Sequence, residues 1–193
     1  MAFGVMNILY PKLRLAWLPA MLGYSVVGAL LAGVYGVLHD QVTYSVSPEY
    51  FTRLKFSQFH YANFGLPPRL FVAEIGFLAT WWFGFFAAWF IARITVPTFA
   101  PAVRSRHTIR GLLITFAFAL ASSMLGNALG ILHGPDYSAW EALASALRIV
   151  DLPGFVRVAY IHNAGYLGGL IGLITAIIYL RKIKTVAPAC ALN

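Results

Sequence analysis

Four long runs of apolar residues divide the chain, and shorter polar stretches separate them. Each run has about the 20 predominantly apolar residues that an α-helix needs to cross a hydrocarbon core of about 30 Å. The runs cover residues 15–38, 70–91, 111–132 and 158–180. The first run is too long for the apolar core of a cleaved signal peptide, so we expect it to remain in the mature protein. The pattern predicts an all-α integral membrane protein, a four-transmembrane-helix bundle in a single membrane domain of residues 1–193.

Two of the polar stretches, after the first run and after the third, contain signals for the start of a helix. Ser47, Pro48 and Glu49 place an N-cap serine, a proline at the first helical position and an acid near the positive helix end. Ser138 and Glu141 have the spacing of a capping box. Apolar residues at roughly helical spacing follow both signals. We therefore predict two short amphipathic interfacial helices on the outer face of the bundle.

The two halves of the chain share an order of features. Residues 36–39 and 130–133 each read glycine, two aliphatic residues and histidine at the end of an apolar run. An acid, a serine, a proline and an arginine then follow in both halves, although the spacings differ. Two parallel helical hairpins related by an axis along the membrane normal would give this order. The sequence therefore suggests a tandem repeat of hairpins, about 15–95 and 109–182.

Composition and charge support a membrane protein and indicate its orientation. The chain is 60% hydrophobic and only 10% charged, whereas soluble domains carry about 25% charged residues. Its net charge is +8, and nine of the 14 basic residues lie on the side that holds both termini. That side carries Lys12, Arg14, Arg93, Arg104, Arg106, Arg110, Arg181, Lys182 and Lys184, and the opposite side carries Arg53, Lys55, Arg69, Arg148 and Arg157.

This distribution leads us to expect a bacterial-type inner (plasma) membrane, with both termini in the cytoplasm and the two long polar loops in the periplasm. The basic residues on the inner side then meet anionic lipid headgroups of the bilayer, and nothing indicates a nucleic-acid partner. The only cysteine is Cys190, so an intramolecular disulfide and a multi-cysteine metal site are excluded.

Small residues predict close contacts between helices. Gly165 with Gly169, and Gly168 with Gly172, have the four-residue spacing that lets two membrane helices approach closely. Such faces pack within the bundle, or against other membrane subunits or a second copy of the chain.

Four ionisable side chains should converge at the outer mouth of the bundle. His39 and His133 end the first and third spans, and Glu74 and His162 lie near the starts of the second and fourth. Imidazole suits Zn, Cu, Fe or Ni, a carboxylate can join it, and helix bundles often house such sites. We therefore expect a divalent transition metal, with haem as a variant, although no HExxH, ExxH or HxH spacing supports the site. Polar neighbours that could support the ligands are Asp40, Asn127, Asp136 and Asn163.

Each candidate also has a purely structural explanation. A histidine at a helix C-terminus complements the helix dipole, which would account for His39 and His133. His162 with Asn163 could form an interhelical hydrogen-bond pair.

Glu74 lies about 6 Å below the outer end of its span, so it could reach Arg69 or Arg157 instead of a site. Three functions therefore stay open. The first is a periplasm-facing metal site or membrane metalloenzyme built on the four candidates. The second is a non-catalytic accessory subunit of a larger membrane complex. The third is a proton or substrate carrier that uses Glu74, and it is the weakest because no charge lies at mid-membrane.

Overall fold

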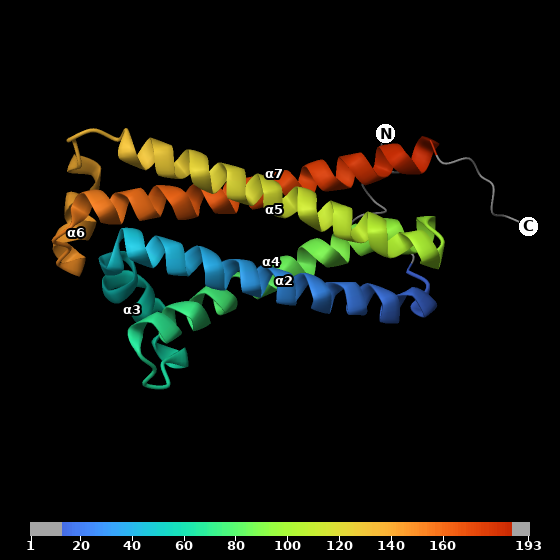
Figure 1. The fold of residues 1–193 in the computed structure, drawn as a ribbon, viewed down its shortest axis with the longest axis horizontal. Coiled ribbons are helices and arrows are strands. Elements are labelled where there is room, and N and C mark those ends of the chain that lie inside the picture. Colours follow the sequence, from blue (N-terminus) through green and yellow to red (C-terminus); the bar gives the residue numbers. More distant parts are fainter. Residues whose placement is uncertain (1–12, 187–193) are drawn as a thin grey trace, which may run out of the picture.

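The structure, a computed structural model, describes residues 13–186. Its fold consists of four long helices (Figure 1). They are α2 (Leu18–Val46), α4 (Pro68–Thr98), α5 (Pro101–Ile131) and α7 (Leu152–Val186). All four are long and apolar enough to cross a membrane, and many large apolar side chains on their outer surfaces are exposed. The predicted all-α four-helix membrane bundle is confirmed, with lipid as the environment of those exposed faces.

The helices pack as two antiparallel hairpins, α2 with α4 and α5 with α7 (Figure 1). Glycines bring the partners together, because a Cβ on Gly36 would collide with the backbone of Gly76. A Cβ on Gly168 or Gly172 of α7 would likewise collide with the backbone of α5, which confirms the contact predicted from their spacing, while Gly169 faces Phe83 of α4. The single domain and the duplication of a hairpin stay predictions, since pairing alone does not test them.

The first long helix continues well past the end of its apolar run. Helix α2 extends to Val46, seven residues beyond His39, so His39 and Asp40 lie within the helix. Residues 41–46 include no glycine or proline that would end it. The helix stops at Ser47, whose extended backbone (φ −147°, ψ 100°) is the conformation favoured before a proline. The helix-dipole explanation for His39 is therefore wrong.

Both predicted short helical segments are present at one end of the bundle, which we call the loop end (Figure 1). The first is a π-helix, η2 (Tyr50–Lys55), followed by α3 (Phe56–Gln58) and a 3₁₀ turn, η3 (His60–Ala62). It turns inward, so that Tyr50 and Phe51 are only 7% and 0% exposed. The predicted N-cap bond of Ser47 is absent, because its buried Oγ has no hydrogen-bond partner among residues 13–186.

The second segment is a 3₁₀ turn, η4 (Ser138–Trp140), followed by α6 (Glu141–Leu147). The predicted capping box does not form, because the backbone N–H of Ser138 donates to Asp136 Oδ1 at 3.0 Å and starts a tighter turn. This hydrogen bond also holds the pKa of the Asp136 carboxyl below its usual value. Asp136 is thus engaged in the turn.

Glu49 links the two hairpins at the loop end. Its Oε2 accepts hydrogen bonds from the backbone N–H groups of Val150 at 2.9 Å and Asp151 at 2.7 Å. Asp151 Oδ1 in turn accepts from the N–H of Gly154 at 3.1 Å, which caps the first turn of α7. Glu49 therefore stabilises the start of α7. The sequence had predicted that it would stabilise the start of its own helix instead.

We expect Glu49→Gln to lower the free energy of unfolding by about 1–2 kcal/mol, because two charge-assisted hydrogen bonds become neutral or are lost. The measurement is thermal unfolding in detergent. Glu141→Gln is the matched control, since Glu141 is an exposed acid in the first turn of α6 and should contribute only about a few tenths of a kcal/mol. Equal shifts in the two variants would contradict a linking role for Glu49.

Candidate functional site

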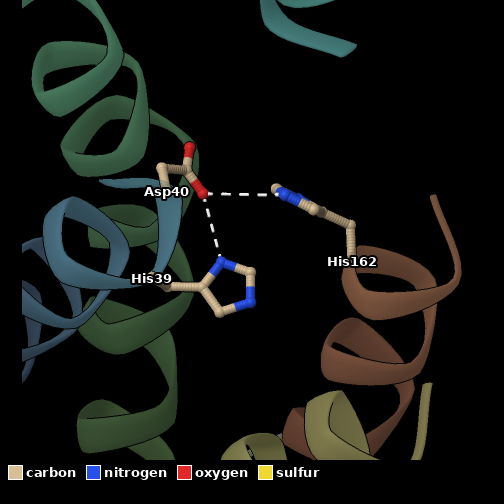
Figure 2. A group of neighbouring side chains, drawn as sticks. All are labelled: His39, Asp40 and His162. Atoms are coloured by element: carbon tan, nitrogen blue, oxygen red, sulfur yellow. Dashed lines mark hydrogen bonds and ion pairs between the residues drawn. The ribbon is translucent and has the colours of Figure 1, made fainter. Parts of the chain in front are cut away.

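Three side chains from two helices meet between the hairpins, and we call them the His–Asp–His cluster: His39 and Asp40 of α2, and His162 of α7 (Figure 2). His39 Nδ1 lies 3.2 Å from Asp40 Oδ1, and His162 Nε2 lies 3.8 Å from the same oxygen. Each residue offers one ligand atom, and the three atoms all lie within 4.8 Å of one another. The cluster could hold a metal ion.

The distances in the cluster can be compared with those around a tetrahedral metal. Nitrogen and oxygen ligands at about 2.0–2.2 Å from zinc lie about 3.3–3.6 Å from one another. The separations of 3.2 and 3.8 Å lie on either side of this range, and the third is at most 4.8 Å. Side-chain movements of about 1 Å would bring all three atoms into one coordination shell.

The cluster is buried within the helix bundle. Asp40 and His162 are 4% and 3% exposed. A carboxylate there is costly unless cationic or hydrogen-bonding groups surround it. Asp40 has the two imidazoles beside it, and the charge of Lys55 acts on it from the loop end. Burial lowers the pKa of the Lys55 ammonium, and the Asp40 carboxylate partly offsets that effect.

Neighbouring hydroxyls hold the His162 ring in place. Its Nδ1 lies 3.4 Å from the Tyr166 hydroxyl, one turn further along α7. Its Nε2 lies 3.3 Å from Thr43 Oγ1, which also bonds to backbone oxygens of its own helix. Metal binding through Nε2 requires the tautomer in which Nδ1–H donates to the Tyr166 hydroxyl, while Thr43 Oγ1 keeps its hydrogen bond to its own helix. Ligating histidines normally hold their second ring N–H on a carboxylate, a carbonyl or water, and here the Tyr166 hydroxyl is the acceptor within reach.

The π-helix η2 covers the cluster at the loop end. The Tyr50 ring lies 4.9 Å from the His162 ring between centroids, and the Phe51 ring lies 6.1 Å away. Lys55 Nζ lies 5.8 Å from the centroid of the Tyr50 ring. Burial raises the pKa of the Tyr50 hydroxyl, so it stays protonated near neutral pH. π-Helical segments are rare and often occur at functional sites.

A cavity of about 870 Å³ adjoins the cluster, and residues of all four long helices line it. His39, Asp40 and His162 are among its lining residues, together with Lys55 from η2. The volume is within the range of small-molecule pockets, about 300–1,000 Å³. The cluster therefore has room beside it for a ligand or substrate.

Only two of the four candidate ligands chosen from the sequence belong to the His–Asp–His cluster. The structure brings His39 and His162 together, whereas the ligand group within 4.8 Å includes neither Glu74 nor His133. His133 Nδ1 pairs with the Tyr160 hydroxyl at 2.9 Å. Glu74 Oε2 is buried and has no hydrogen-bond partner in the described part of the chain.

The structural explanation proposed for Glu74 is wrong. Arg69 bonds to the side chains of Gln41 and Ser45, and Arg157 donates to Asn127 Oδ1 at 2.8 Å. Among residues 13–186 neither arginine pairs with Glu74.

The four residues that the sequence suggested as supports for the ligands do not all lie at the cluster. Asp40 is part of the cluster itself, while the hydrogen bonds of Asn127 and Asp136 are made to Arg157 and Ser138. Asn163 is exposed although His162 is buried, because successive helical residues point about 100° apart. His162 does contact the other hairpin through Thr43 Oγ1 at 3.3 Å, whereas the exposed Asn163 lies on another face of α7.

Several residues that contact the cluster were not predicted from the sequence. Thr43 and Tyr166 each follow a cluster histidine by four residues, a spacing that places them on the same helical face and could have revealed them. Tyr50 and Lys55 gave no such signal, because a loop segment carries them to α7 and α2 from a distant part of the chain.

The fold and the cluster define a class, a multi-pass α-helical membrane protein with a buried histidine–aspartate group that could hold a metal ion. Comparisons with protein-family models, curated proteins and solved structures find no match for the chain. The function must therefore be inferred from the site itself.

Proposed function

We propose that the protein binds one divalent transition metal ion through His39, Asp40 and His162. The observation that carries this proposal is the set of three ligand atoms, of the right chemical types, within 4.8 Å of one another in a buried position. The Tyr166 hydroxyl beside His162 Nδ1 supports it, because it offers an acceptor for the second ring N–H, which a ligating histidine needs to donate.

The donor set favours zinc or ferrous iron. Two imidazoles and one carboxylate form the ligand set of non-haem iron oxygenases, and catalytic zinc sites likewise use three protein ligands with a fourth position open. The adjoining cavity supports an open position for water or substrate. The site is thus of the metalloenzyme type rather than a closed structural site.

The contact between the two histidines favours an ion over haem. The rings of His39 and His162 meet edge to face, with centroids 4.9 Å apart, and both approach the same oxygen of Asp40. A single ion fits among these three atoms, whereas a porphyrin between the rings would displace Asp40.

The location is part of the proposal. The excess of basic residues on the side of the termini supports a plasma membrane of bacterial type with cytoplasmic termini, which puts the loop end and the cluster near the periplasmic face.

Equilibrium dialysis of the detergent-purified, chelator-stripped protein against zinc tests the proposal. We expect about one zinc ion per chain by elemental analysis, as a three-ligand site requires. A protein that takes up no zinc, iron or other transition metal, and that co-purifies with other membrane subunits, would contradict the proposal and support the accessory-subunit alternative.

A further inference from the structure

Three polar atoms near the cavity lack partners. They are Tyr35 Oη, Ser123 Oγ and His39 Nε2, and all three are buried without a hydrogen-bond partner in the described part of the chain. The hydroxyls of Tyr35 and Ser123 lie near each other, and a contact between them would still leave one hydroxyl hydrogen and His39 Nε2 without a partner. All three residues line the same cavity. Buried polar groups without partners cost free energy, so a cluster of three in one place indicates a missing ligand.

The rest of the cavity wall is mostly apolar. Leu78, Phe83 and Leu170 contribute to it, and the Tyr35 ring stacks on the ring of Phe116 with centroids 5.8 Å apart. Water could bond to the three polar atoms, but it would not favourably fill a space of about 870 Å³ with apolar walls. The occupant that fits has a small polar part and a large apolar part.

The cavity borders the lipid-facing surface. Trp82 and Leu170 line it, and each is 50% exposed on the outside of the bundle. Both residues lie in the membrane-spanning parts of α4 and α7. A ligand can therefore enter sideways from the bilayer.

We infer that the cavity binds a neutral, membrane-soluble carbonyl compound of the quinone class. The hydroxyls of Tyr35 and Ser123 donate to the carbonyl oxygens, and the stacked aromatic wall lies along the flat ring. A neutral head is favoured because the cavity lining holds one acid, Asp40, and one basic side chain that can balance it, Lys55. The apolar tail extends along the wall toward the lipid. Binding at this site needs no metal, although the cavity is the one that adjoins the proposed metal site.

The test measures binding of a decyl-substituted benzoquinone to the chelator-stripped protein in detergent by isothermal titration calorimetry. Decylbenzene, which has the same tail without carbonyls, is the matched ligand. We expect saturable quinone binding, with decylbenzene at least about tenfold weaker, because it cannot accept the hydrogen bonds. Tyr35→Phe and Ser123→Ala should each weaken quinone binding by about fivefold. Ser145→Ala, which removes an exposed hydroxyl on α6, should leave it unchanged.

Equal affinities for the two ligands, an absence of saturable binding, or an unchanged quinone affinity in both hydroxyl variants would each overturn the inference. Thermal unfolding confirms that the variants fold, and the comparison of the two ligands on the unaltered protein does not depend on any variant. Because the protein is metal-free and Tyr35 and Ser123 are not proposed metal ligands, failure here is distinct from failure to bind zinc.

Discussion

Replacing His162 with glutamine lowers the zinc affinity of the protein by at least about 100-fold, since removal of a ligand should exceed the 10–100-fold effect of losing an outer partner. The substitution removes the nitrogen that lies 3.8 Å from Asp40 Oδ1, and only His39 and Asp40 remain. Asp40→Asn should have an effect of the same order. Competition with a chromophoric chelator measures both affinities.

Two kinds of control make this prediction specific. His60→Gln changes an exposed loop histidine that bonds to the backbone of Ser57, and it should leave zinc affinity unchanged. Glu74→Gln and His133→Gln separate the cluster from the wider site expected from the sequence, because neither residue belongs to the group of ligand atoms. A large loss of affinity in these two variants, with little loss in His162→Gln, would refute the cluster as the metal site.

Adding one methyl group to Gly36 destabilises the bundle, whereas the same change at Gly23 does not. A Cβ on Gly36 meets the carbonyl of Gly76 and the Thr80 hydroxyl, while a Cβ on Gly23 meets nothing within 4 Å. Overpacking of this kind costs about 1–3 kcal/mol or more, because a backbone cannot move aside cheaply. Gly23→Ala instead gains up to about 1 kcal/mol of helix propensity.

Thermal unfolding in detergent compares Gly36→Ala with Gly23→Ala. The two glycines lie on the same helix and undergo the same chemical change, so a difference in stability reports the contact between α2 and α4. Gly36 also lies one turn before the cluster, so zinc affinity should fall together with stability. Equal stabilities would contradict the close packing of this hairpin.

The fold was largely predictable because the membrane imposes a simple rule. A span must have about 20 apolar residues, and small residues must lie where helices touch without a hydrophobic drive between them. Both features can be recognised in a short stretch of sequence. Gly168 and Gly172 are an example of small residues at a helix contact. The ends of the helices were less predictable. Helix α2 passes His39 without a break, because backbone hydrogen bonds continue after the apolar run has ended.

The composition of the site could be predicted only in part. His39 and His162 lie on helices of different hairpins, and their meeting depends on how far each helix is rotated about its own axis. His133 lies in the turn that follows α5 and pairs with Tyr160, and no single-helix pattern determines where that turn goes. Asp40 was expected only as a supporting residue, because the sequence placed it at the end of a helix. It lies instead in a buried turn of α2.

The covering of the site could not be predicted from local patterns. Tyr50 begins a segment in which Arg53 and Lys55 are interleaved with apolar residues, as in a surface helix, yet it is buried against His162. The π-helical winding of residues 50–55 places it there, and no simple residue pattern indicates that winding.

X-ray absorption spectroscopy of the zinc-loaded protein tests the central claim most directly. We predict a first shell of nitrogen and oxygen at about 2.0–2.2 Å, without sulfur, and outer-shell scattering from two imidazoles, those of His39 and His162. A sulfur shell at about 2.3 Å, or a zinc shell without imidazole scattering, would contradict the proposed metal site.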